Sequence, residues 1–249
     1  MEVKSLNNKN VTYVLVALII GISFTISSYF LSNGLINLRA ERKVITVTGS
    51  AKKQIRSDLV KWTGMYSAQA KDLKEAYKLL EESQKKVKDY FLSKGLSEKD
   101  LIFSSISTQT IYEMLPNGIY STKVDSYKLS QSVQITSKDV DKITDLSRKS
   151  TELINSGVQF ESMPPQYYYT KLADLKIQML SLATEDAVRR AKQIAKSTGS
   201  SVERLKSASM GVFQITPLYS TEVSDYGIND TTSIDKEITA VVNCEFIIK

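Results

Sequence analysis

An uncharged segment near the N-terminus constrains this chain most. Residues 11–33 carry no charge, and residues 11–31 are apolar or small and polar throughout, with Tyr13, Tyr29 and Phe30 near the two ends. At 1.5 Å per residue these 21 residues form a helix of roughly 32 Å, enough to cross a hydrocarbon core of about 30 Å. A buried helix of a soluble protein would show a polar face. The segment therefore predicts one transmembrane helix with aromatic residues at the membrane interfaces.

The same segment invites comparison with a cleavable signal peptide. Such signals have an apolar region of about 7–15 residues followed by a site of the A-x-A type. This apolar region is longer, and residues 32–38 offer no convincing pair of small residues at that spacing. We therefore expect a retained anchor at 11–31, preceded by a short head (1–10) and followed by a linker (32–42) and one α+β domain (43–249).

The orientation of the anchor follows from position rather than charge. Lys4 and Lys9 precede the segment and Arg39, Arg42 and Lys43 follow it, so the positive-inside count does not decide. A single N-terminal span with a ten-residue head normally sends the large C-terminal part across the membrane. We expect a single-pass protein of the cell membrane with its main domain extracytoplasmic, in the periplasm of a cell with two membranes. With no cysteine near the end of the span, lipoprotein attachment is excluded.

Two absences from the composition exclude whole classes of chemistry. The chain has no histidine and one cysteine, Cys244. Ser-His-Asp and Cys-His catalysis, His-ligated zinc and haem with a proximal histidine are excluded, as are thiolate clusters and an intrachain disulfide. No cofactor is expected.

The charge of the chain does not favour nucleic acid as a partner. Residues 1–39 hold three of the 33 basic and one of the 27 acidic residues, so the remaining 210 hold 30 and 26, a net charge of +4. Nucleic-acid binding calls for basic residues clustered on one face with aromatic residues among them. Here Lys and Arg alternate with Glu and Asp along the predicted helices, which is typical of solvated helix faces.

Hydrophobic periodicity predicts alternating strands and helices in the order ββαββαβαββ. The predicted strands are residues 43–49, 59–66, 101–112, 127–136, 158–169, 204–216 and 237–248, and the predicted helices are residues 69–94, 139–156 and 171–197. We expect hairpins from the first and second pairs of strands, and an edge, bulge or strand end at Pro164-Pro165. The fold class is α+β: a mixed or antiparallel sheet with about three helices packed on one face, preceded by the transmembrane helix.

Several motifs of the soluble part resemble the SIMPL domain family. Residues 44–62 match its opening at Thr48-Gly49 and Asp58, with Ala51 and Ser57 where a second Gly and a Pro are usual. Residues 183–199 match the spacing of its alanine-lined helix, and two short pairs match a strand start and a helix end. The matching residues are Ala183, Asp186, Ala187, Arg190, Ala191, Ala195 and Gly199 in the helix, with Ser126-Tyr127 and Ser156-Gly157 as the pairs.

The resemblance covers residues 44–248. It implies a cellular location and a non-catalytic kind of role, and it implies no particular reaction. Bacterial members of the family are typically exported or periplasmic, some are linked to oxidative-stress tolerance, and one periplasmic antigen assembles into a large ring. Animal members act in kinase signalling. No catalytic residues are established for the family, so the resemblance implies none in this chain.

For most of the candidate catalytic or metal-binding residues, a structural role explains the sequence better. Ser-x-x-Lys occurs at 50–53 and 83–86 without the partner motifs of penicillin-recognising enzymes. Helix capping is favoured over metal binding for the first two of the three aspartates at 139, 141 and 145. Glu81-Glu82 lies on a solvated helix side, Cys244 lies on a core face, and Asn229-Asp230-Thr231 is a glycosylation sequon only in a host that glycosylates. No catalytic, cofactor-binding or metal-binding residue is assigned.

Three consecutive tyrosines form the best candidate contact surface in the sequence. Tyr167, Tyr168 and Tyr169 cannot all be buried on one strand face, so at least one is expected to be exposed, and exposed aromatic residues favour interfaces. Two long polar loops, residues 116–126 and 217–236, would line the central space of a ring.

The expected function is a non-enzymatic role as an oligomeric scaffold or binding module of the cell envelope, stress-related by resemblance. The expected partners are the membrane, further copies of the chain and a protein partner. Two alternatives stay open: an envelope hydrolase that uses carboxylates or a bound metal, and a signalling adaptor.

Overall fold

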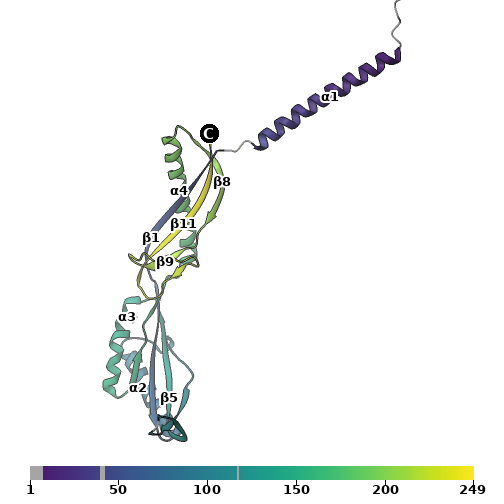
Figure 1. Ribbon diagram of the computed structural model, residues 1–249. Coiled ribbons are helices and arrows are strands. Elements are labelled where there is room, and N and C mark those ends of the chain that lie inside the picture. Colours follow the sequence, from purple (N-terminus) through teal and green to yellow (C-terminus); the bar gives the residue numbers. More distant parts are fainter. Residues whose placement is uncertain (1–7, 40–42, 117) are drawn as a thin grey trace, which may run out of the picture. The chain divides into compact units, whose positions relative to one another are not determined.

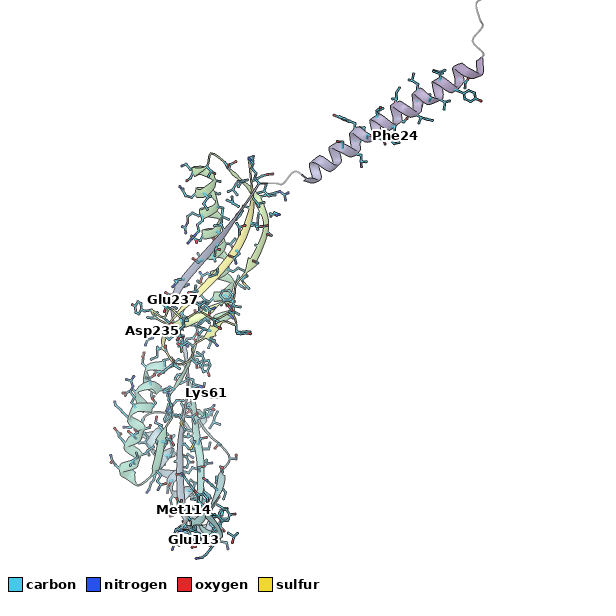
Figure 2. All side chains as sticks on the ribbon, in the orientation of Figure 1. Phe24, Lys61, Glu113, Met114, Asp235 and Glu237 are labelled. Carbon is cyan, nitrogen blue, oxygen red and sulfur yellow. The ribbon has the colours of Figure 1, made fainter. Side chains whose placement is uncertain are left out.

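The computed structural model describes residues 8–39, 43–116 and 118–249 (Figure 1). Helix α1 (Asn8–Arg39) includes the predicted span, and its Thr12–Ser32 part is long and apolar enough to cross a membrane. No part of that segment is buried by protein, and Phe24, 76% exposed, projects from the helix (Figure 2). Residues 1–7 of the predicted head and 40–42 of the predicted linker lie outside the described residues.

The chain divides into two compact units. The first comprises Met1–Thr46, Ala191–Ser207 and Glu245–Lys249, and the second comprises Val47–Arg190 and Ala208–Cys244. Within the first unit, Ser201 and Lys249 exchange two backbone hydrogen bonds, and the Ile248 N–H donates to Lys43. All the surfaces discussed below lie in the second unit.

A six-stranded sheet is built around two long antiparallel strands, β2 (Leu59–Ala70) and β5 (Tyr120–Ser137). They pair continuously from Val60 opposite Ser137 to Ala70 opposite Tyr127. The shorter strands are β3 (Leu101–Phe103) and β4 (Ser107–Met114) beside β5, and β6 (Gln159–Ser162) and β7 (Gln166–Tyr168) beside β2. Every pairing in this sheet is antiparallel.

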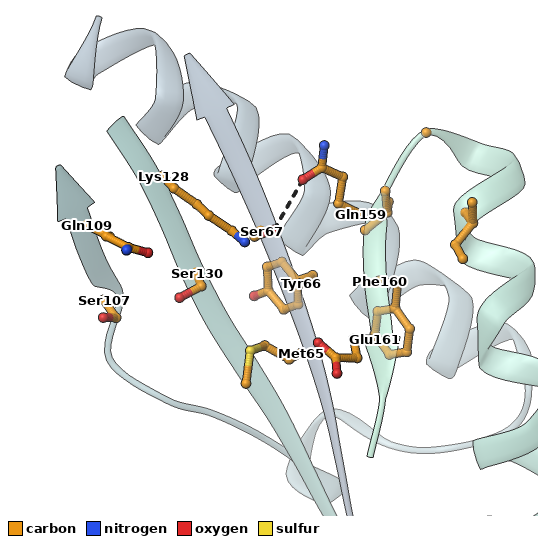
Figure 3. Close-up of a pocket in the computed structure, with 13 residues that line it drawn as sticks. Met65, Tyr66, Ser67, Ser107, Gln109, Lys128, Ser130, Gln159, Phe160 and Glu161 are labelled. Atoms are coloured by element: carbon orange, nitrogen blue, oxygen red, sulfur yellow. Dashed lines mark hydrogen bonds between the residues drawn. The ribbon is translucent and has the colours of Figure 1, made fainter. Parts of the chain in front are cut away.

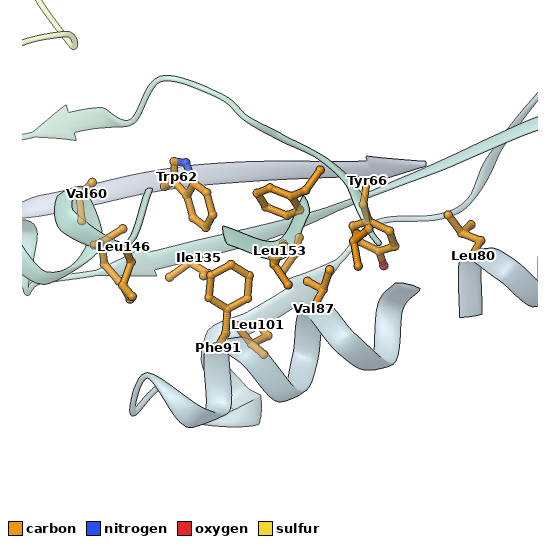
Figure 4. Close-up of a cluster of buried hydrophobic side chains, with 14 of the residues drawn as sticks. Val60, Trp62, Tyr66, Leu80, Val87, Phe91, Leu101, Ile135, Leu146 and Leu153 are labelled. Carbon is orange, nitrogen blue, oxygen red and sulfur yellow. The ribbon is translucent and has the colours of Figure 1, made fainter. Parts of the chain in front are cut away.

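Helices α2 (Leu73–Ser93) and α3 (Val140–Lys149) cover one face of this sheet (Figure 1). Along the chain, the short 3₁₀ helix η1 (Glu98–Asp100) connects α2 to β3, and a second one, η2 (Ser150–Ser156), connects α3 to β6. Apolar residues at three- and four-residue steps give α2 one buried side, and Asp72 caps it by accepting from the Lys74 and Glu75 N–H groups. In the core, the rings of Trp62 and Phe91 meet edge to face at 5.5 Å (Figure 4).

A five-stranded sheet holds the remaining strands. Its order is β1-β11-β9-β10, with β8 also beside β11. The bounds are β1 (Val44–Arg56), β8 (Val202–Met210), β9 (Gln214–Pro217), β10 (Ile228–Asn229) and β11 (Asp235–Ile248). Helix α4 (Leu172–Ser197) presents a buried stripe of four alanines, at positions 183, 187, 191 and 195.

The α+β class and the preceding apolar helix are confirmed, while the strands form two sheets where the pattern suggested one. The hairpin predicted from residues 43–49 and 59–66 is wrong, because β1 pairs with β11 and β2 pairs with β5, β6 and β7. Strand β1 also continues through the lysines to Arg56 beside β11, and Lys52 on its solvent side pairs with Glu237 of β11 at 2.9 Å. The hairpin of β4 and β5 and the break at Pro164-Pro165, between β6 and β7, are as predicted.

Candidate binding surfaces

The residues that carry the family resemblance meet where β1 contacts α4. A Cβ atom placed on Gly49 would lie 2.1 Å from the Ala183 carbonyl oxygen and 2.5 Å from the Ala187 nitrogen. Ala183 and Ala187 are themselves fully buried. Glycine on the strand and alanine on the helix are therefore required by close packing of the two backbones.

Hydrogen bonds and ion pairs of Asp186 stabilise the same contact between β1 and α4. Its carboxylate accepts from the Ser50 N–H at 3.1 Å and from the guanidinium groups of Arg189 at 2.6 Å and Arg190 at 2.7 Å. The hydrogen bond from Arg189, followed by the bonds from Ser50 and Arg190, lowers the pKa of Asp186 to about 2. Asp186 thus joins the start of α4's alanine stripe to β1 and remains ionised at neutral pH.

Asp58, the other acidic residue of the resemblance, holds the start of α4. Its carboxylate accepts from both the N–H and the hydroxyl of Thr170, at 2.7 and 2.8 Å. The Asp58 N–H in turn donates to the Tyr168 carbonyl, and the neighbouring Ser57 N–H donates to Ile234. The turn between β1 and β2 is therefore tied to β7 and to the segment before β11.

A buried lysine completes this junction. Lys236 is only 2% exposed, and its ammonium group donates to the Tyr167 carbonyl at 2.7 Å and to the Asp230 carbonyl. Burial lowers the pKa of Lys236, against the opposing charge of Asp230. With two backbone carbonyls as partners, the ammonium group acts here as a structural cross-link.

The Ser-x-x-Lys matches do not form serine–lysine pairs. Lys53 donates to the Gln178 side chain at 2.8 Å, and Lys86 donates to the Ser156 carbonyl at 2.9 Å. The Ser83 hydroxyl donates to the Leu79 carbonyl within its own helix. Both lysines and Ser83 are thus engaged in contacts with other residues.

The carboxylates considered as metal ligands are separated in the same way. Asp139 caps α3 by accepting from the Lys142 N–H, as predicted. Asp141 pairs with Arg56 at 2.7 Å, and Asp145 pairs with Lys149 at 2.8 Å. Glu81-Glu82 is exposed on α2, and across residues 8–39, 43–116 and 118–249 no three His, Cys, Asp or Glu side chains gather at a metal-binding spacing.

Cys244 and Tyr167 are buried, while the other two tyrosines keep part of their surface exposed. Cys244 is fully buried in β11, and burial raises the pKa of its thiol. Tyr167 is buried, with its hydroxyl 3.1 Å from that of Thr144, while Tyr168 and Tyr169 are half-buried. The expectation that at least one tyrosine is exposed is met only in part, because pairing with β2 turns Tyr167 into the core while Tyr168 and Tyr169 keep part of their surface exposed.

The face of the six-stranded sheet opposite α2 and α3 forms an open polar groove. Side chains at alternate positions of β2 and β5 point to this face, including Met65, Ser67, Lys128 and Ser130 (Figure 3). Neighbouring strands and η2 complete a hollow of about 640 Å³, further lined by Ser107, Gln109, Ile154, Gln159 and Glu161. The Ser67 hydroxyl donates to Gln159 across the groove at 3.2 Å.

The groove contains one positively charged side chain, Lys128, and one negatively charged side chain, Glu161, which do not form an ion pair with each other. Among the described residues, neither Lys128 nor Glu161 makes an ion pair or a side-chain hydrogen bond. Sequence analysis predicted a strand at residues 127–136, where polar and apolar residues alternate, but assigned it no site. A signal was present, because polar residues also alternate along 61–69, yet only the pairing of β2 with β5 places the two polar rows on one surface.

The β4–β5 hairpin ends in exposed apolar side chains. Met114 is 63% exposed and Tyr120 is 66% exposed, and Tyr112, Leu115 and Ile119 are also exposed. Met114 and Glu113 lie near this end of the hairpin in Figure 2. The loop predicted at 116–126 is mostly strand, because β5 begins at Tyr120; residue 117 lies outside the described residues.

These observations define a two-sheet α+β protein with an apolar N-terminal helix that suits a membrane anchor or a signal sequence. The family model of SIMPL, described as a protein of unknown function (DUF541), matches residues 45–246. The chain belongs to this family, as its motifs indicated. The comparison with curated proteins gave no match.

Proposed function

We propose that the protein is a membrane-anchored, non-enzymatic binding module of the cell envelope, with the polar groove of the six-stranded sheet as its binding surface. One observation carries the proposal: a helix-free sheet face presents a hollow of about 640 Å³ with Lys128 and Glu161 available to a ligand. An elongated polar partner with charges of both signs would suit it. The lysines of the Ser-x-x-Lys matches and the aspartates at 139, 141 and 145 are instead engaged in structural contacts.

The anchor and the orientation are supported by the exposed, apolar Thr12–Ser32 segment. We propose that it is retained and that the domain lies outside the cytoplasmic membrane. The buried Cys244 allows a direct test, because a cysteine introduced at the exposed Lys85 of α2 would be the accessible thiol of the described chain.

The test treats intact cells that express Lys85→Cys with a membrane-impermeant maleimide. We expect labelling of Lys85→Cys in intact cells and no labelling of the parent protein, whose Cys244 is buried. Labelling of the variant only after the cells are permeabilised would show a cytoplasmic domain. Protein that leaves the membrane in alkaline carbonate would contradict the anchor.

The binding surface is tested by placing a photo-crosslinking residue at Ser130 in the groove, with Lys85 on the helical side of the same sheet as the matched control. We expect a defined adduct from position 130 that weakens when Lys128 and Glu161 are both changed to Ala. Equal adducts from both positions, or adducts insensitive to the double change, would contradict the groove as the binding surface.

We further propose that the protein forms a homo-oligomer, supported by the exposed apolar end of the β4–β5 hairpin. Light scattering of the full chain in detergent micelles is expected to give a multiple of the 249-residue chain mass. Met114→Ser with Tyr120→Ser should lower that mass. A strictly monomeric parent protein would overturn this part of the proposal.

A further inference from the structure

Strand β4 forms an open edge of the six-stranded sheet. It pairs with β5 alone, and among the described residues no further backbone–backbone hydrogen bond reaches Ser107–Met114. In an antiparallel pair, alternate residues of an edge strand turn their N–H and C=O groups away from the paired neighbour. A row of backbone donors and acceptors is therefore available to one more strand beside β4.

The composition of this edge favours such pairing. Residues 107–112 are serine, threonine, glutamine, threonine, isoleucine and tyrosine, with no charge, no proline and no glycine. An uncharged six-residue segment rich in β-branched and aromatic residues pairs readily with another strand when it lies on an open edge. The two register shifts that disturb β4 lie beyond Ile111, so residues 107–111 keep a regular register.

The other long edge strands of the described chain are protected. Strands β1 and β8 each carry three charged residues, and on β1 the Ser50 N–H donates to Asp186 of α4. The opposite edge of the six-stranded sheet is interrupted by Pro164-Pro165, between β6 and β7. Charges and prolines of this kind keep natural sheet edges from pairing. Residues 107–112 of β4 contain neither. The charged residues are Lys52, Lys53 and Arg56 on β1 and Glu203, Arg204 and Lys206 on β8.

A second copy of the chain supplies a strand that matches this edge. Two copies of β4 can face each other over residues 107–112 without bringing like charges together. Glu113, the next residue, already pairs with Lys123 of its own chain at 2.6 Å. In an antiparallel pair centred near Gln109, Tyr112 of one copy lies beside Ile106 of the other, and both side chains are exposed. This apolar contact then forms twice, as a two-fold axis requires.

We propose that the β4 strands of two copies pair antiparallel about a two-fold axis and join the two six-stranded sheets into one continuous sheet. The inference rests on the proposed homo-oligomer and names its interface. The exposed Met114 lies directly beyond the paired segment. Since paired residues of antiparallel strands point to the same face, the two polar grooves come to lie on one face of the joined sheet.

Disulfide cross-linking of the full chain in detergent micelles tests the pairing. A single cysteine replaces each of residues 107–111 in turn, and Lys85→Cys on α2 is the matched control. We expect a disulfide-linked dimer with one maximum within positions 108–110, because the central residues of the two strands come within reach of a disulfide. Ser107→Cys and Ile111→Cys should give less dimer. The parent protein and Lys85→Cys should give none, since Cys244 is buried.

An edge-blocking variant tests the same interface without oxidation. Thr108 is exposed on β4, so Thr108→Lys places a charge on the edge, whereas Thr108→Val keeps the shape and the preference for a strand. Thr108→Lys should lower the mass measured by light scattering about twofold, and Thr108→Val should leave it unchanged. Thermal unfolding checks that both variants are folded.

The outcomes separate this interface from the oligomer itself. A strictly monomeric parent protein would overturn both. A parent oligomer that Thr108→Lys leaves intact, with no cross-linking maximum on β4, would overturn the β4 interface and leave the homo-oligomer standing. As much dimer from Lys85→Cys as from the central β4 positions would also overturn the interface.

Discussion

At the scale of single residues, the motif positions of this family prove to be packing positions. Gly49 and Asp186 come from segments more than 130 residues apart, yet they serve one contact between β1 and α4. Asp58 and Lys236 serve a second contact in the same manner.

Gly49→Ala is expected to destabilise the domain by about 1–3 kcal/mol, because the added Cβ overlaps the backbone of α4. Urea unfolding of the full chain in detergent measures this free energy. Gly211→Ala is the matched control, since its Cβ would meet Val241 only at 3.5 Å or beyond. Equal stability of the two variants would contradict the packing role of Gly49.

Asp186→Asn is expected to lower the thermal unfolding temperature at neutral pH but not in acid. The pKa of Asp186 is about 2 in the folded protein, below the roughly 3.9 of an unfolded aspartate, so its contribution is full above about pH 4 and is lost as the pH falls through 2. Scanning calorimetry from pH 7 to pH 2 should show the parent and the variant converging. A constant difference across this range would contradict the role of the ionised carboxylate.

At the scale of elements, helices were predicted better than strand partners. The periodicity of α2, α3 and α4 is a local property, and their caps lie within a few residues of their ends. Strand partners are not local, because β1 pairs with β11, which lies at the other end of the chain. The turn at Ser57-Asp58 looked like that of a hairpin because nothing in the local sequence shows that its two strands enter different sheets.

Asp72→Ala should cost about 1 kcal/mol by removing the cap that satisfies two N–H groups of α2. Asp89→Ala, at an exposed position of the same helix, is the control and should change the free energy of unfolding by a few tenths of a kcal/mol at most. Urea unfolding compares the two. A larger effect at Asp89 would show that charge along the helix outweighs capping.

Considered as one molecule, the protein has two parts suited to different surroundings: the apolar helix α1 suits a lipid bilayer, and the α+β domain suits water. The helix exposes apolar side chains along Thr12–Ser32, which water would not favour, whereas the domain buries the apolar residues of its core. The proposed binding groove lies in the domain, on the sheet face opposite α2 and α3.

Ile22→Arg is expected to shift part of the protein out of the carbonate-resistant membrane fraction, since an arginine at the centre of a span costs about 2.5–3.5 kcal/mol. Ser32→Arg places the same charge at the end of the span, where it can reach the interface, and should have little effect. Immunoblots of the fractions measure the difference. Identical fractionation of both variants would contradict a membrane-spanning role for the centre of α1.

Composition and the contacts between near neighbours were enough to predict the apolar span, the three amphipathic helices, the α+β class, the family and the chemistries that lack of histidine excludes. The three-dimensional structure was needed to show that the strands form two sheets, that Gly49 and Asp186 meet where β1 contacts α4, and that the polar groove exists. The groove is assembled from β2, β5 and β6, which are distant in the chain, so no local pattern could reveal it.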